Sequence, residues 1–465
     1  MPRIAVAGPS SVVTDAAVGV GNEGGSVTDV AIVAALTAMC SEPGVCGPGG
    51  GGFLTIDLPT HPPVVIDGYM SYPGKGFSGL PYLREVSMTY GGGVTTLVDA
   101  GSVAVPGVFA GLELASQMFG NVPWAELMEA VAVAIEDGFP LSYPSHLYLN
   151  EGAAPIYRND AVARDALFED ERSKPLGSSI VFPGLAETLR HIGEHGAAVF
   201  YRGDLARAIV DDLTQRGGQL TMEDMTSYEA IARPPLRAQR GEWSLSLNPE
   251  PAVGGVTVVD TLAATSDGSA VARVEGLVAA FERRQGSALR SPSTISIAAA
   301  DDEGGVVAAS FSAGYGAGLI PAGTGMLMNN ALGEQELAKA EWAPGERMIS
   351  NMAPTVARRE REAVAVGSPG ADRITTAVVT TLIRLAAGDS LQQAIEHPRL
   401  HPEFGEDGVR VAAEPGQHLD DLDLPVRHFD RRHMYFGGVN GAAFVDGRLQ
   451  AHADARRTGS VAFTT

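Results

Sequence analysis

The sequence changes character near its middle, and this change constrains the fold more than any single motif does. In the first half, apolar residues recur at helical spacing, for example in "SVTDVAIVAALTAM" and "PWAELMEAVAVAIEDGF". In the second half, "STISIAAADDEGGVVAASFSAG" and "GAAFVDGRLQAHAD" each predict two strands joined by a tight turn. Helices followed by hairpins predict an α/β (α+β) fold in which helices cover an antiparallel or mixed sheet.

The composition is that of an ordinary globular chain with an acidic surface. Of the 465 residues, 45% are hydrophobic and 19% are charged, and the formal net charge is −22. This charge excludes a nucleic-acid partner and an anionic membrane surface as partners, because both require a basic face. No apolar stretch reaches the length of a membrane span, and the N-terminus lacks the pattern of a secretory leader. We therefore expect a cytoplasmic protein.

Neither the cysteines nor the histidines nor the glycine run predict a metal or cofactor site. Cys40 and Cys46 lie in one apolar, glycine-rich region, which predicts buried thiols. His397 and His401 are four residues apart, but a proline follows each of them, so no helix places both on one face. The run "GPGGGGF" lies between a predicted helix and a predicted strand, whereas a dinucleotide-binding loop has the opposite order. We interpret its glycines as positions of close backbone approach.

Two short motifs have features that catalytic sites use. In "GSPGAD" a predicted strand ends in a tight turn and a helix begins. Such a turn directs the backbone N–H groups of Gly370 and Ala371 toward one point, which is how an oxyanion hole is built. In "ISNMAPT", Ser350 and Asn351 lie side by side before a proline. Taken alone, each motif is more typical of an ordinary turn or polar loop.

Taken together, segments along most of the chain resemble the γ-glutamyltranspeptidase (glutathione hydrolase) family. They include "GNEGGSVTDVAIVAAL", "CGPGGGGFLTI", "VAVPGVFAGLELA", "PGERMISNMAPTV", "GSPGADRITTAVV" and "FGGVNGAAFVDGRLQAHADARRTG". The resemblance implies the N-terminal-nucleophile hydrolase fold, a four-layer αββα sandwich. It also implies one domain over residues 1–465, with a large-subunit-like part at 1–291 and a small-subunit-like part at 292–465.

The nucleophile position is where the sequence departs most from this family. The family's precursor cleaves itself before a threonine, whose hydroxyl then attacks a γ-glutamyl amide. Aligning "TIS" at 294–296 with the family's motif places Pro292 at that threonine, and proline has no nucleophilic side chain. Ser293 would face the other side of a strand, and Thr294 lies about 6–7 Å further along it. Both residues are therefore candidate nucleophiles only.

Positions that bind the substrate in this family are also substituted. The resemblance places Tyr69 where the family has the Arg that binds the substrate α-carboxylate, and a phenol cannot replace a bidentate guanidinium. Glu334 stands for the Asp that binds the substrate ammonium. The other correspondences are Ser310 and Ser312 for a Thr and an Asn that orient the nucleophile, Ser350 and Asn351 for two serines near the carboxylate, and Gly370 and Ala371 for the oxyanion glycines.

These substitutions lead to two hypotheses about function. The first is a degenerate family member that does not cleave itself and has little or no γ-glutamyl transfer activity. It would bind a small γ-glutamyl-like or other amide ligand, or would partner an active paralogue. The segment between Gly255 and Pro292 is much shorter than in the family, which supports this hypothesis. The alternative is an active amide hydrolase or acyltransferase that uses Ser293 or Thr294 on a non-glutamyl substrate.

Overall fold

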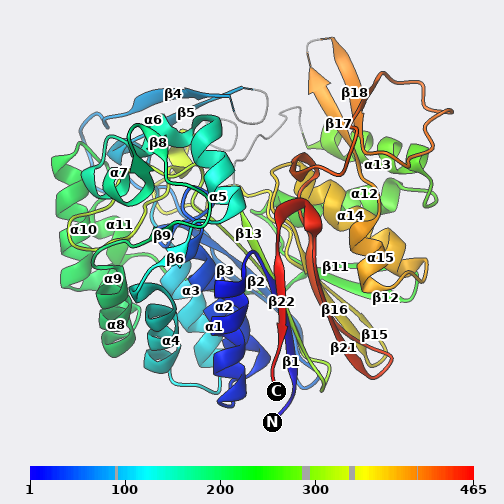
Figure 1. Ribbon diagram of the computed structural model, residues 1–465, viewed down its shortest axis with the longest axis horizontal. Coiled ribbons are helices and arrows are strands. Elements are labelled where there is room, and N and C mark those ends of the chain that lie inside the picture. The colour runs from blue at the N-terminus through cyan, green and yellow to red at the C-terminus, as the bar shows by residue number, and fades with distance from the viewer. Residues whose placement is uncertain (90–92, 285–293, 335–340, 406) are drawn as a thin grey trace.

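The computed structural model places two β-sheets face to face, with helices covering both outer faces (Figure 1). The structure describes residues 1–89, 93–284, 294–334, 341–405 and 407–465. The layers follow the order helix, sheet, sheet, helix, as the sequence predicts. Among the described residues, no helix combines the length and the apolar character needed to cross a membrane.

The first sheet has seven strands, and every neighbouring pair in it is antiparallel. The predicted hairpin of the second half lies at its centre, between strands from the beginning of the chain. In spatial order the strands are β10 (Ile231–Arg233), β3 (Val64–Gly68), β2 (Gly51–Asp57), β14 (Val306–Ser312), β13 (Ile295–Asp301), β1 (Ile4–Gly8) and β22 (Ser460–Phe463).

The second sheet has six strands and is also antiparallel throughout. Its last two strands form the predicted C-terminal hairpin, which turns at Asp446 and Gly447. In spatial order the strands are β11 (Leu236–Arg240), β12 (Trp243–Leu247), β15 (Thr355–Arg359), β16 (Glu362–Gly367), β20 (Asn440–Val445) and β21 (Arg448–Ala453).

Small side chains fill the space between the two sheets. Because strand residues alternate between faces, the even-numbered residues of β13 and β14 face the second sheet and the odd-numbered ones face the helices. The layer between the sheets is rich in alanine and consists of Ala298, Ala300, Val306, Ala308, Val356, Ala363, Ala365 and Ala442. Short side chains let the two sheets approach closely. At one end of the same strands, this face carries Ser296 on β13 and Ser310 and Ser312 on β14.

The first outer layer covers the first sheet, with α2 (Val27–Ser41) at the centre of the helices that touch the sheet and further helices packed on these. At the start of α2, the Ser26 hydroxyl accepts the Asp29 N–H at 3.2 Å, and Asp29 in turn accepts the Ser26 N–H at 2.9 Å. This reciprocal cap fixes the start of the helix. The longer helices of the layer are α1 (Ser11–Asn22), α2 (Val27–Ser41), α3 (Val108–Phe119), α4 (Trp124–Glu136), α8 (Leu185–His195) and α10 (Asp204–Gln215).

The opposite outer layer covers the second sheet. It consists of α12 (Val253–Ala264), α14 (Arg373–Ala386) and α15 (Leu391–Glu396). Beside it, α13 (Ala270–Arg283) packs on a small sheet of β17 (Leu400–Gly405), β18 (Gly408–Ala413) and β19 (Val426–His428) (Figure 1). The shorter elements of the chain are β4 (Arg84–Met88), β5 (Val94–Val98), α5 (Tyr143–Tyr148), α6 (Ala154–Tyr157), α7 (Ala161–Leu167), α9 (Ala198–Arg202) and α11 (Met222–Thr226).

Most predicted elements are present, with two differences in the first half. The sequence pattern of residues 184–218 predicts two helices, whereas the structure has three, because the short helix α9 lies between α8 and α10. The N-terminal segment, for which the sequence pattern predicts no element, forms β1 and α1. The strand β1 is completed by pairing with β13 and β22 from the far end of the chain.

Candidate functional site

The candidate site begins where β13 enters the first sheet. Pro292 and Ser293, the predicted nucleophile position and its neighbour, lie outside the described residues, as does the division predicted between residues 291 and 292. Thr294 is described and buried, directly before β13. It lines a small cavity together with Ser296, Pro369, Asn440 and the buried carboxyl group of Glu42. Thr294 therefore lies next to the "GSPGAD" turn. This position agrees with the even-numbered residues of β13, which face the second sheet.

Two predicted site serines lie on β14, on the same face as Ser296. Ser310 pairs with Ser296 across the strands, and the Ser310 hydroxyl has no hydrogen-bond partner among the described residues. The Ser312 hydroxyl accepts the Gly314 N–H at 3.1 Å. This face therefore carries two buried hydroxyls, at the positions where the resemblance predicts a Thr and an Asn.

The glycine run packs directly against these serines. A Cβ atom on Gly50 would lie 2.2 Å from the Ser312 carbonyl oxygen, and one on Gly52 would lie 2.2 Å from that of Ser310. No side chain fits at such distances, so the predicted close backbone approach is confirmed. The run leads into β2, which pairs edge to edge with β14.

Tyr69 is held firmly in the loop that follows β3. Its N–H donates to Asp67 Oδ1 at 3.0 Å, and its carbonyl accepts the Tyr228 hydroxyl at 2.7 Å. Its ring stacks on Phe53 with 5.2 Å between the centroids. Asp67 is anchored in turn by an ion pair with Arg233 at 2.8 Å. Tyr69, which the resemblance predicts at an Arg position, is therefore a well-packed part of the core.

The electrostatics of Tyr69 place two other predicted site residues beside it. Burial raises the pKa of Tyr69 well above its usual value, and the negative charge of Glu334 raises it further. Hydrogen bonding with the Ser350 side chain opposes this rise in pKa. Glu334 and Ser350 therefore both act on the Tyr69 phenol, and among the charges around it Glu334 raises its pKa most.

Asn351, the residue after Ser350, is connected through Arg284 to the "GSPGAD" turn. Arg284, the C-cap residue directly after α13, donates through Nη1 to Asn351 Oδ1 at 3.2 Å. The same guanidinium donates through Nη2 to Asp372 Oδ1 at 2.7 Å. Asp372 directly follows Ala371, one of the two predicted oxyanion residues. Arg284 therefore bridges the two motifs that sequence analysis considered separately.

The turn itself has the strained geometry of a site loop. Gly370 has φ of 128° and Ala371 has φ of 58°, both in the left-handed region, which an alanine seldom adopts. A Cβ atom on Gly370 would lie 3.1 Å from Gly437 Cα, and the Ser368 hydroxyl accepts the Gly438 N–H at 3.1 Å. The turn is thus fixed by the segment that precedes β20.

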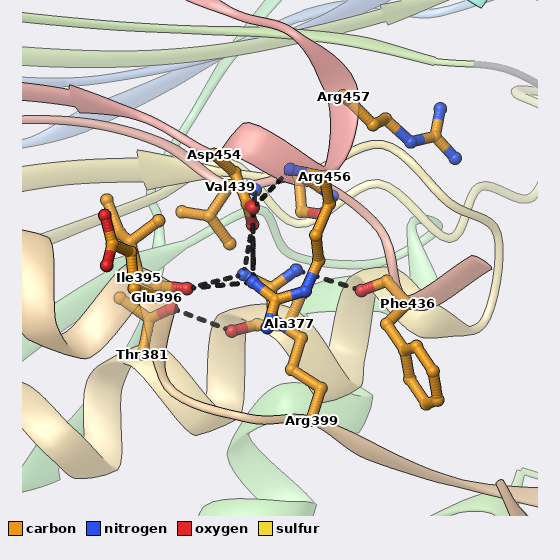
Figure 2. A network of polar contacts seen from close by, with 12 residues as sticks. Ala377, Thr381, Ile395, Glu396, Arg399, Phe436, Val439, Asp454, Arg456 and Arg457 are labelled. Atoms are coloured by element: carbon orange, nitrogen blue, oxygen red, sulfur yellow. Dashed lines mark hydrogen bonds and ion pairs between the residues drawn. The ribbon is translucent and has the colours of Figure 1, made fainter. Parts of the chain in front are cut away.

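A buried ion network holds that segment in place (Figure 2). Arg399 Nη2 pairs with Asp454 Oδ2 at 2.6 Å, and both side chains are almost fully buried. Arg399 also donates to the Phe436 carbonyl at 3.0 Å, and Asp454 accepts the Val439 N–H at 3.1 Å. Burial would raise the pKa of Asp454, but Arg399 and Arg456 hold it below its usual value.

The network reaches the candidate site through Asn440, the residue after Val439. Its side-chain amide donates to the Ser296 carbonyl at 2.7 Å, and so links the segment to β13. The sequence motifs do not indicate a role for Asn440, Arg284, Asp372 or the ion network. Their partners lie far away along the chain, so no local spacing could have indicated them; only the segments "FGGVN" and "AHADARR" pointed to this region.

The chain is similar to known proteins along nearly its whole length. A sequence profile described as Gamma-glutamyltranspeptidase matches residues 14–280 and 270–464. The chain is 28% identical to the Acylase ACY 1 proenzyme of Pseudomonas sp. (strain V22), over 94% of this chain and 89% of that protein. It is 26% identical to the glutathione hydrolase proenzyme of Pseudomonas aeruginosa, over 85% and 82% of the respective chains.

A solved structure supports the fold in the same way. The crystal structure of cephalosporin acylase from Bacillus halodurans superposes with a TM-score of 0.81 at 20% sequence identity. The superposition covers 99% of this chain and 96% of that one. Together these matches confirm the predicted resemblance and the predicted four-layer sandwich.

Proposed function

Because this chain belongs to the γ-glutamyltranspeptidase family, we propose that it is a member that keeps the fold and a ligand site but does not transfer γ-glutamyl groups. The observation that carries this proposal is the position of Tyr69. A γ-glutamyl substrate presents an α-carboxylate, which would meet a buried phenol beside the Glu334 carboxylate. Tyr69 offers that carboxylate one neutral hydroxyl in place of a bidentate guanidinium, so the carboxylate would lose its charged partner.

The sequence supports the same proposal at the nucleophile position. Pro292 stands where the family has its reactive threonine, so neither self-cleavage nor acyl transfer has a hydroxyl at that residue. The acidic composition is compatible with the cytoplasm, which we propose as the location. We also propose that an active paralogue is a candidate partner.

We expect the purified protein to release no aniline from a chromogenic γ-glutamyl anilide above the uncatalysed rate. Tyr69→Arg should not restore turnover, because it returns a guanidinium to the carboxylate site but no nucleophile to residue 292. The measurement is the initial rate of both proteins at equal concentration, with a family glutathione hydrolase as the positive control. Turnover by the unaltered protein that disappears in a Ser293→Ala or Thr294→Ala variant would contradict the proposal.

A second function is favoured by a specific observation, the similarity to acylase proenzymes over nearly the whole chain. We propose as this second candidate an amide hydrolase or acyltransferase that uses Thr294 or Ser293 on a non-glutamyl acyl group. The burial of Thr294 beside Pro369 and the "GSPGAD" turn supports it.

If this second candidate is correct, Thr294→Ala or Ser293→Ala should abolish hydrolysis of at least one member of a broad amide panel. The Ser87→Ala variant, which alters a hydroxyl on the distant strand β4, is the matched control and should retain full activity. Equal rates for all four proteins would exclude the second candidate.

A further inference from the structure

Asn351 contains a buried hydrogen-bond donor that no described residue satisfies. The side chain is 4% exposed, and its Oδ1 accepts from Arg284 at 3.2 Å. Its Nδ2 is shielded from solvent and has no hydrogen-bond partner among the described residues. An unsatisfied buried donor costs about 1–3 kcal/mol, so its presence beside a candidate site points to a ligand that accepts from it.

Arg284 determines which atom of the Asn351 amide is left for that ligand. A guanidinium carries only donors, so the amide must turn its oxygen toward Arg284 and its NH2 group away. The guanidinium is held by Asp372 at 2.7 Å, with the two side chains 10% and 9% exposed. It also lies 5.0 Å from the centroid of the Phe281 ring. Arg284 is therefore a positioning residue, and Asn351 is the residue that makes the contact.

The charges around the donor favour a neutral acceptor over an anion. The positive charge of Arg284 already faces the Asp372 carboxylate. On the other side, Ser350 precedes Asn351 and contacts Tyr69, whose pKa is raised by burial and by the charge of Glu334. A carboxylate entering here would approach that negative charge, whereas a carbonyl oxygen requires only a donor.

We propose that Asn351 Nδ2 binds the neutral carbonyl oxygen of an amide-containing ligand, and that Arg284 and Asp372 orient Asn351 for this contact. This inference deepens the proposed ligand-binding function and rests on it. It replaces the acidic group of a γ-glutamyl substrate by an uncharged acyl amide at this point of the site. Nothing in the proposal requires a chemical step.

The test is a ligand-observed NMR titration of the full chain with butanamide and butanoate, which are similar in size but differ in charge. We expect butanamide to bind at least fivefold more tightly than butanoate. The Asn351→Asp variant keeps an oxygen for Arg284 and loses the donor, so it should bind butanamide at least tenfold more weakly. Equal binding of butanamide by this variant, tighter binding of butanoate by the unaltered protein, or no butanamide binding at all would overturn the proposal.

The role of Arg284 is tested by a matched set of variants. Arg284→Met should weaken butanamide binding at least threefold, because Asn351 is then free to turn. Arg284→Lys keeps a donor for Asn351 Oδ1 and should bind within twofold of the unaltered protein. The control Arg283→Met alters the neighbouring arginine, which is half exposed and pairs with Asp260 instead. Equal loss in the Met and Lys variants of Arg284, or a loss in the control, would overturn the positioning role.

Thermal unfolding of each variant shows whether a loss of binding is a loss of folding. If Asn351→Asp does not fold, the difference in butanamide binding between Arg284→Met and Arg284→Lys still tests the proposal. Failure of the proposed function has a different signature, which is cleavage near residue 292 or γ-glutamyl turnover. A cleaved protein whose butanamide binding depends on Asn351 would overturn the proposed function and keep this inference.

Discussion

Replacing Asp454 by Asn should lower the free energy of unfolding by about 3–5 kcal/mol, measured by urea denaturation. The substitution keeps the size of the side chain and removes its charge. Arg456 would then keep its ion pair with Glu414, whereas Arg399 would lose the carboxylate with which it pairs in a region closed to water. Leaving a buried cation without its carboxylate destabilises the folded state more than most single substitutions do.

The matched control for this prediction is Asp302→Asn. Asp302 pairs with Arg3 at 3.1 Å, but the Arg3 side chain is 68% exposed, so water screens the pair. Pairs of this kind contribute at most about 1 kcal/mol. Similar destabilisation by the two variants would show that the buried network does not support the segment around Val439. A large effect confined to Asp454 would confirm that it does.

Glu42→Gln should remove a pH dependence of stability worth about 3 kcal/mol. Burial is the main cause that raises the pKa of Glu42 from 4.5 to about 7, although the Ser142 and Ser145 hydroxyls that donate to it oppose the rise. The folded state therefore binds the proton more tightly than the unfolded state does. This stabilisation is fully present below about pH 4.5 and is lost as the pH rises through about 7.

The measurement is the difference in unfolding free energy between the unaltered protein and Glu42→Gln at several pH values. The variant should gain stability relative to the unaltered protein as the pH rises from about 4.5 to 8.5. Ser145→Ala removes a hydrogen bond that lowers the pKa of Glu42, so in that variant the loss of stability should start at the same pH but continue to a higher pH. Parallel curves for the unaltered protein and Glu42→Gln would contradict the assignment.

Much of the fold could be predicted because its signals are local. The Ser26 cap, the end of α3 at Gly120 and the Asp446–Gly447 turn each depend on residues a few positions apart, and the turn lies where the hairpin pattern predicts it. The elements that were missed depend on distant partners. β1 is a strand because β13 and β22 pair with it, and five residues alone do not indicate that.

The site divides in the same way between local and long-range information. The resemblance identified Tyr69, Glu334 and Ser350 one by one, and the structure brings them together. It did not identify Arg284, because the contact with Asn351 joins residues 67 positions apart in the chain. Ser293 lies outside the described residues and stays a prediction.

The most direct test of the proposal as a whole is the intact mass of the purified protein under denaturing conditions. Electrophoresis and mass spectrometry should both show one species near 48.3 kDa, because residue 292 is a proline and the chain is not cleaved there. The result should persist after prolonged incubation at neutral pH. Two species whose masses correspond to cleavage next to residue 292 would contradict it.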